Sequence, residues 1–256
     1  MTIFESIILG IVEGITEFLP ISSTGHLILT STLLGIEHTE FVKTFEIAIQ
    51  FGAILSVVAL YWRSFLDIEI LKRLAAAFLP TAAIGLALYS FIKTYLLGNE
   101  LVVVVALAIG GVALIVFELL YKEGDETKHS IADLTYTQAV FIGLFQSLAV
   151  IPGVSRSAAT IVGGLLTSGL SRVAIVEFSF LLAVPVMLSA TGLDLLKTSA
   201  AFSNQEWLVL AVGFVVSFLV ALASIVWLLK FVRTHTFIPF GIYRILVAGV
   251  FFFLFF

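Results

Sequence analysis

Long apolar runs separated by short polar connections dominate this chain. Four runs are plainly apolar, and two more are long enough despite an internal Glu177, Asp194 or Arg244. About 20 mostly apolar residues suffice for a helix to cross the hydrocarbon core of a bilayer. The pattern therefore predicts six membrane-spanning helices, at residues 41–62, 74–92, 101–121, 173–196, 207–229 and 237–256.

Two further apolar stretches, 3–34 and 139–170, are interrupted near their middle by Pro20 and by Pro152-Gly153. Each half has about 15 residues, too few to cross a bilayer alone. Non-helical backbone at membrane depth is tolerated only where protein buries it or where it lines a cavity. We therefore expect two re-entrant helix pairs; a kinked, tilted hairpin of two thin spans is the alternative.

The two broken stretches resemble each other. Gly10 matches Gly143 and Glu13 matches Gln146 at an offset of 133, and with one residue dropped Pro20 matches Pro152 and Ser23 matches Ser155. A broken pair followed by three spans crosses the membrane an odd number of times, so the second copy is expected to run inverted. Such repeats place a polar site near the midplane. We expect one domain, with repeats at about 3–121 and 138–256 joined by a cytoplasmic loop at 122–137.

Composition supports an all-α polytopic membrane protein. Of 256 residues, 61% are hydrophobic and 12% charged, and the mean hydropathy is +1.18, whereas soluble domains carry about 25% charged residues. The net charge of −4 excludes a nucleic-acid footprint. The absence of cysteine excludes disulfides, thiolate metal sites and cysteine nucleophiles. The N-terminus lacks the features of a cleaved secretory signal, so we expect it in the mature protein.

Basic residues are distributed unequally between the two expected sides. Eight lie on the side of the 122–137 loop and three on the other, so the positive-inside rule places the eight in the cytoplasm and both termini outside. The first broken pair would then enter from the external face. The eight are Arg63, Lys72, Arg73, Lys122, Lys128, Arg172, Lys230 and Arg233, and the three are Lys43, Lys93 and Lys197.

Ionisable residues inside apolar segments are functional candidates. Glu13 and Glu17 stand four residues apart, on one helix face, and two like charges at that spacing repel. They would be kept for a shared proton, a divalent cation, or a substrate that brings its own cation. A solvated helix edge is the alternative. Glu46, Gln50 and Glu177 are candidates for a supporting role around the site.

The first break opens a half-helix with hydroxyl groups at its start. Helix starts offer free N–H groups and a positive dipole end to a phosphate, although serine and threonine are also ordinary N-caps. His26, one turn further on, could exchange a proton with a hydroxyl or carry charge toward an anion. The candidates here are Ser22, Ser23, Thr24, Gly25 and His26.

The second break repeats this design with an arginine in place of the carboxylates. Arg156 at a helix start could bind phosphate oxygens bidentately, with a snorkelling interfacial arginine as the alternative. Arg244 in the last span is a candidate for a second phosphate ligand, again with snorkelling as the alternative. The neighbouring candidates are Gly153, Ser155, Ser157 and Thr160.

The motifs EGITEFLPISSTGH at 13–26 and PGVSRSAAT at 152–160 resemble the two signatures of the undecaprenyl-diphosphate phosphatase family, the bacitracin-resistance proteins. KTFEIAIQFGAIL, EFSFLLAVP and GIYRILVAG extend the similarity over nearly the whole chain. By resemblance, the family's functional residues correspond to Glu13, Glu17, Ser22, Ser23, His26, Ser155, Arg156 and Thr160.

The resemblance implies an enzyme of the bacterial inner membrane that removes the terminal phosphate from a C55 isoprenyl diphosphate and so recycles the cell-wall carrier lipid. It also implies a divalent cation, Mg²⁺ or Ca²⁺, and an active site at the external face. The expected partners are the prenyl diphosphate and membrane lipids; a homodimer is left open.

As a hypothesis, Arg156 and the N–H groups of both helix starts hold the terminal phosphate, while Glu13 and Glu17 bind the cation. Ser23, activated by His26 or Glu17, is our preferred nucleophile because it sits where backbone donors converge. His26 itself and a water activated by Glu17 are the other candidates. A lipid-phosphate transporter or flippase using the same inverted-repeat site is the alternative function.

Overall fold

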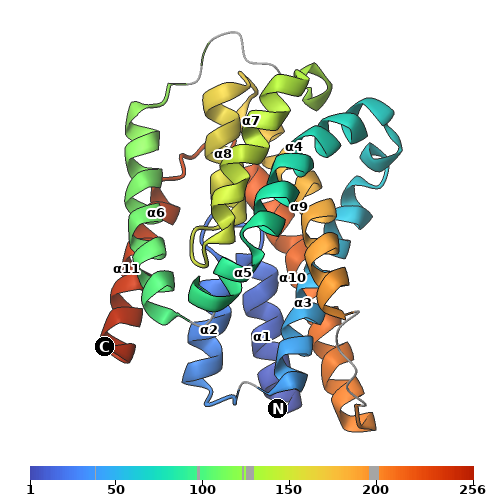
Figure 1. The fold of residues 1–256 in the computed structure, drawn as a ribbon, viewed down its shortest axis with the longest axis vertical. Helices are drawn as coiled ribbons and strands as arrows, with labels where there is room; N and C mark the ends of the chain where they lie inside the picture. Colours follow the sequence, from blue (N-terminus) through green and yellow to red (C-terminus); the bar gives the residue numbers. More distant parts are fainter. Residues whose placement is uncertain (38, 97–98, 123, 125–129, 196–201) are drawn as a thin grey trace.

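The computed structural model describes residues 1–37, 39–96, 99–122, 124, 130–195 and 202–256, and this part of the chain is helical with no strand. Figure 1 shows a bundle of long helices with two pairs of short ones packed among them. The helices are α1 (Ile3–Thr16), α2 (Ser23–Leu33), α3 (Glu40–Tyr61), α4 (Ile68–Ala87), α5 (Tyr89–Phe91), α6 (Glu100–Leu120), α7 (Tyr136–Gln146), α8 (Arg156–Thr167), α9 (Arg172–Leu195), α10 (Asn204–Phe231) and α11 (Ile238–Phe255). Short 3-10 turns η1 (Ser64–Leu66), η3 (Ile131–Asp133) and η4 (Ser147–Val150) and a π-helix η2 (Ile92–Leu96) join them.

Five helices in the described ranges are long and apolar enough to cross a membrane: α3, α4, α6, α9 and α10. α11 is a further apolar helix of 18 residues. The prediction of an all-α, multi-pass membrane protein is therefore confirmed, while the predicted bounds of one helix are wrong. α4 begins at Ile68 rather than at residue 74, because the Asp67 side chain accepts hydrogen bonds from the backbone N–H groups of Glu69 and Ile70.

The two broken stretches form pairs of short helices. α1 has 14 residues, α2 and α7 have 11 each, and α8 has 12. At 1.5 Å per residue these helices are about 16–21 Å long, shorter than the roughly 30 Å hydrocarbon core. The α1–α2 pair and the α7–α8 pair enter the bundle from opposite ends, and their breaks lie near its middle (Figure 1).

Local structure recurs between these pairs at an offset of 133 residues. Thr2 and Glu5 form a capping box at the start of α1, and Thr135 and Gln138 form the same box at the start of α7. Ser22 and Ser155, each directly before the second short helix, have φ of 74° and 75° and are the non-glycine residues of positive φ in the described chain. The structure therefore matches Ser155 with Ser22, without the dropped residue that paired it with Ser23.

Each short pair packs against a long helix of the other half of the chain. α1 lies along α10, and α7 lies along α4. Glycines allow the close approach: a Cβ on Gly14 of α1 would come within 2.8 Å of the Ser217 carbonyl oxygen on α10, and Gly143 of α7 meets the Ala77 carbonyl of α4 in the same way. Small residues are the usual means by which membrane helices bring their backbones together.

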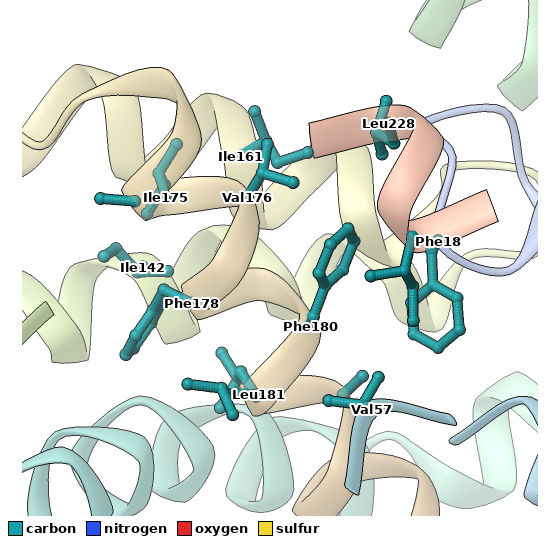
Figure 2. Packing of buried hydrophobic residues seen from close by; sticks show 14 of the residues in the cluster. Phe18, Val57, Ile142, Ile161, Ile175, Val176, Phe178, Phe180, Leu181 and Leu228 are labelled. Atoms are coloured by element: carbon teal, nitrogen blue, oxygen red, sulfur yellow. The ribbon is translucent and has the colours of Figure 1, made fainter. Parts of the chain in front are cut away.

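The main hydrophobic cluster surrounds the breaks. Figure 2 shows Phe18, from the first break, beside Phe180 of α9, with ring centroids 5.3 Å apart in an edge-to-face arrangement. Residues from α3, α7, α8 and α10 close the cluster around them, among them Val57, Ile142, Ile161 and Leu228. The irregular backbone of the first break is thus anchored by an aromatic side chain buried in the core.

Ionic contacts join the helix ends on the side of the 122–137 loop. Arg172, at the start of α9, donates to both carboxylate oxygens of Glu118 near the end of α6, and the Phe237 N–H before α11 donates to the same carboxylate at 3.0 Å. Lys128, Lys197 and part of the predicted loop, residues 123 and 125–129, lie outside the described residues, as does the side chain of Lys93.

We predict opposite effects for two glycine-to-alanine substitutions. Gly14→Ala should lower stability by about 1–3 kcal/mol, because the new methyl group meets the α10 backbone. Gly85→Ala on α4 has no described atom within 4 Å of the new Cβ and should stabilise by up to about 1 kcal/mol through helix propensity. Thermal unfolding in detergent measures both, and equal melting temperatures would refute the close α1–α10 contact.

Candidate active site

A cavity of about 300 Å³ lies where the two breaks meet. One part of its wall is polar and comes from both breaks and from α3, α4 and α7. The other part is apolar and comes from η4, the second break and α9. The polar lining residues are Glu17, Ser22, Ser23, Thr24, Gln50, Thr81, Gln146, Gly153, Ser155 and Arg156. The apolar ones are Ala149, Val150, Ile151, Pro152, Val186 and Met187.

A carboxylate at this cavity connects the two halves of the chain. Oε1 of Glu17 accepts a hydrogen bond from Nη2 of Arg156 at 3.0 Å, and Oε2 accepts one from the Ser23 hydroxyl at 2.6 Å. Arg156 also donates from Nη1 to the Ser179 carbonyl at 2.8 Å. The side chains of this ion pair are only 11% and 6% exposed, and such burial strengthens charge interactions. The structure thus brings Glu17, Ser23 and Arg156 together, as the sequence predicted.

Two helix starts converge on the same cavity. Ser22, Ser23 and Thr24 line it from the start of α2, and Ser155 and Arg156 line it from the start of α8. First-turn N–H groups have no partner within their own helix, and the positive dipole end favours an anion there. The arrangement of two helix starts, hydroxyl groups and a guanidinium is suited to a phosphate group.

Glu13 lies one turn before Glu17, behind the cavity wall. Its side chain is fully buried, and neither carboxylate oxygen has a hydrogen-bond partner among the described residues. The charged side chains that interact electrostatically with Glu13 are those of Glu17, Glu46 and Arg156. A buried carboxylate with so little compensation is costly, so the pair Glu13 and Glu17 suits either a shared proton or a shared cation.

The donor set fits a cation that is shared with a substrate. In the described part of the chain, no cluster of three or more histidine, cysteine or acidic side chains could enclose a metal. Mg²⁺, however, is commonly held by one or two carboxylates together with phosphate oxygens of the substrate. Glu17, which lines the cavity, and Glu13, one turn behind it, are the two carboxylates available for such a cation.

His26 faces away from Ser23. Its Nδ1 lies 2.7 Å from the Ser22 carbonyl oxygen, which can only accept, so Nδ1 carries the proton. Its Nε2 lies 2.8 Å from the hydroxyl of Tyr243 on α11. No hydrogen bond joins the described side chains of His26 and Ser23, and His26 does not line the cavity. Of the two bases considered for Ser23, the geometry therefore favours Glu17.

Arg244 is not among the residues that line the cavity, and its side chain does not extend to a membrane interface. Its side chain is fully buried, with Nη1 donating to the carbonyls of Pro20 at 3.4 Å and Val154 at 3.0 Å. Nη2 donates to those of Ala106 at 3.1 Å and Gly153 at 2.9 Å. The structure thus corrects the snorkelling alternative and does not support a phosphate-ligand role from this position: the guanidinium bonds to three carbonyls of the two breaks and to one carbonyl within α6.

Three other candidates also frame the cavity rather than line it. The Ser157 hydroxyl donates to the Phe18 carbonyl at 2.9 Å and so joins α8 to the first break. The Thr160 hydroxyl bonds to Gln146 Oε1 at 3.1 Å. Gly25 faces side chains of α6. Their expected direct contact with substrate is therefore not supported by their positions.

Of the three candidates for a supporting role, Gln50 lines the cavity. Glu46 interacts electrostatically with Glu13. Glu177 lies in a separate pocket beside Arg233. The sequence reading missed Thr81, which lines the cavity and accepts a hydrogen bond from the Gln146 amide at 3.0 Å. Gln146 could have been identified, because it matches Glu13 in the repeat. Tyr243 was missed too; its position next to Arg244 was the only signal.

The helical membrane architecture and the cavity between two broken helix pairs define a multi-pass membrane protein with a polar cavity suited to an anion. Residues 6–250 match the family model described as bacitracin resistance protein BacA. The chain belongs to this family.

Full-length relatives agree with that assignment. A protein of Aquifex aeolicus is 54% identical, with 100% of both chains covered, and a protein of Sulfurihydrogenibium sp. is 54% identical, with 99% of each covered. A protein of Wolinella succinogenes is 50% identical, with 99% of this chain and 98% of the relative covered. All three are named undecaprenyl-diphosphatase.

We predict that Arg244→Gln lowers the free energy of unfolding by about 3 kcal/mol or more, because several buried carbonyls would lose their donor at about 1–3 kcal/mol each. Arg233→Gln, at an exposed arginine, should change stability by no more than about 0.5 kcal/mol. Thermal and denaturant unfolding in detergent measure both. An Arg244→Gln protein of normal stability that has lost phosphate binding would restore the phosphate-ligand interpretation.

Proposed function

We propose that this protein is an integral membrane phosphatase that hydrolyses undecaprenyl diphosphate to undecaprenyl phosphate and inorganic phosphate. The observation that carries the proposal is the buried arrangement of Ser23, Glu17 and Arg156 at two converging helix starts. The names of relatives about 50% identical over their full length support the same substrate. The enzyme would thereby return the carrier lipid to cell-wall synthesis.

The first chemical step uses the hydrogen bond between Ser23 and Glu17. Ser23 Oγ attacks the terminal phosphorus while its proton passes to Glu17 Oε2, which accepts from this hydroxyl in the structure. The bond from that phosphorus to the bridging oxygen breaks, and undecaprenyl phosphate leaves with the bond's electron pair. Water then hydrolyses the phosphoserine and releases inorganic phosphate. Direct attack by a water activated by Glu17 remains the alternative.

Arg156 and the helix starts bind and orient the head group. The Arg156 guanidinium and the first-turn N–H groups of α2 and α8 would donate hydrogen bonds to the phosphate oxygens and stabilise the negative charge that develops on them. We propose that Glu13 and Glu17 hold Mg²⁺ or Ca²⁺. The cation would neutralise part of the diphosphate charge. The tight engagement of both His26 nitrogens favours a positioning role for this residue over a nucleophilic one.

For the topology, we propose six spans and two re-entrant pairs related as an inverted repeat, in the inner membrane of a bacterium. The short lengths of α1, α2, α7 and α8 and their entry from opposite ends support this arrangement. The basic residues would lie in the cytoplasm and the cavity would open to the external face. A homodimer stays a prediction.

A lipid-phosphate transporter is the less favoured function. Inverted repeats with broken helices also occur in transporters, but transport needs no hydroxyl donating to a buried carboxylate, and the relatives carry the name of a phosphatase. The two functions differ in one measurable product, inorganic phosphate.

We predict that Ser23→Ala lowers the rate of phosphate release from a long-chain prenyl diphosphate by at least about 10²-fold. Ser31→Ala is the matched control, since that buried hydroxyl on α2 has no hydrogen-bond partner in the described chain. Acid quenching of the wild type during turnover should trap phosphate on Ser23. Substantial activity in Ser23→Ala would shift the nucleophile to water or His26, and no release from the wild type would favour the transporter.

We predict that a chelator abolishes phosphate release and that Glu13→Gln raises the cation concentration for half-maximal release by about tenfold or more, because one of two carboxylate ligands is lost. Glu40→Gln, at the exposed start of α3, should leave the cation titration unchanged. Titrations with Mg²⁺ and Ca²⁺ measure the effect. An unchanged titration for Glu13→Gln would remove this residue from the proposed cation site.

A further inference from the structure

An apolar groove of about 170 Å³ lies between α6 on one side and α7 and α8 on the other. Four of its lining residues are small: Gly110 and Ala113 of α6, and Ala158 and Ala159 of α8. α6 packs mainly against α11 and has few contacts with α8. Figure 1 shows the α6–α11 pair on one flank of the molecule, next to α8. The small side chains and the loose α6–α8 contact leave room for a ligand.

The groove and the polar cavity share one wall. This wall is formed by the 3-10 turn η4 and the second break that follows it. Leu148 and Val154 face the groove, whereas Ala149 to Gly153 and Ser155 face the cavity. Ile151 lines the cavity and is still 36% exposed, and Leu148 is 52% exposed. A chain leaving the cavity over η4 would therefore meet exposed apolar side chains and then the groove.

Arg244 does not make the groove polar. It is the charged residue among the described lining residues, and both of its terminal nitrogens are bonded to the four carbonyls of the breaks and α6. The lining of the groove, as far as the structure describes it, offers no carboxylate and no hydroxyl. Its chemistry therefore selects a branched or unbranched hydrocarbon and rejects a polar group.

We propose that this groove binds the first isoprene units of the lipid substrate, next to the diphosphate, an inference that rests on the proposed function. An amphipathic diphosphate must keep its head group in the cavity while its chain passes to the surrounding lipid. At the shared wall, residues 148 to 155 present a polar surface and an apolar surface within a few residues of each other. Burial of the chain there would fix the depth and direction of the head group relative to Ser23.

A second apolar groove is the rival location. It lies between α1 and α10, with a volume of about 500 Å³, and its lining includes Ile15, Leu19, Ala223 and Trp227. It lies next to Glu17 in sequence, but α10 contributes no residue to the cavity lining. The α6–α8 groove, in contrast, borders the segment that supplies most of the cavity's apolar wall. We therefore place the chain in the α6–α8 groove.

Three alanine-to-phenylalanine variants distinguish these sites, since all three alanines are exposed. Ala113→Phe fills the α6–α8 groove, Ala223→Phe fills the rival groove, and Ala211→Phe on α10 is the control. Phosphate release is measured with a C55 prenyl diphosphate and with methyl diphosphate, a short substrate that has the head group but no isoprene unit to enter the groove. We expect Ala113→Phe to lower kcat/KM for the C55 substrate by about tenfold, mainly through KM, with little effect on the short substrate. Equal losses on both substrates, no loss, or a selective loss in Ala223→Phe would overturn the proposal.

A labelling experiment tests the groove independently of turnover. A C55 diphosphate analogue with a photoreactive group in an isoprene unit close to the head group is irradiated with the wild type, and the labelled peptides are identified. We expect labels at residues 110–114 and 158–162, reduced in Ala113→Phe. Labels at residues 219–227 would overturn the groove assignment. If the wild type releases no phosphate from either substrate, the proposed function fails, and the labelled positions still decide the groove.

Discussion

The fold depends on one buried arginine side chain that donates hydrogen bonds to backbone carbonyls at the two helix breaks. Arg244 lies in the protein interior and bonds to Pro20, Gly153, Val154 and Ala106 through their carbonyl oxygens. A broken helix inside a membrane protein leaves polar groups that neither water nor lipid can satisfy. The arginine provides donors for both breaks at once, and the carbonyl dipoles in turn stabilise its charge. Each break therefore holds the other in place.

The geometry of the site follows from this arrangement. With the breaks held against each other, the starts of α2 and α8 face one cavity, and Ser157 adds a bond from α8 to the Phe18 carbonyl. Glu17 from one half can then bond to Arg156 from the other. Ser22 and Ser155 adopt positive φ at equivalent positions, a conformation that costs about 1–3 kcal/mol for a non-glycine residue. The surrounding packing and hydrogen bonds maintain this strained backbone beside the cavity.

Much of the fold could be predicted because apolar length and helix-breaking residues are encoded locally. The long helices, the short halves on either side of Pro20 and Pro152, and the group Glu17, Ser23 and Arg156 all follow from residue type and spacing. The failures share a physical cause, which is the direction in which a polar side chain points.

Arg244, Ser157 and Thr160 carry groups that could bind phosphate, but the structure turns them toward protein carbonyls and an amide. His26 turns toward Tyr243, a partner more than two hundred residues away. Composition and spacing specify which groups are available, and only the three-dimensional arrangement determines their partners.

The crossed packing of the two halves has a consequence for biosynthesis. α1 is made first, yet its most extensive contact is with α10, which is made near the end of the chain. The buried carboxylate of Glu13 and the first break likewise depend on Arg156 and Arg244, which emerge from the ribosome much later. The earliest segment of the nascent chain must therefore wait, incompletely packed, until nearly the whole protein has been translated before it reaches its final place.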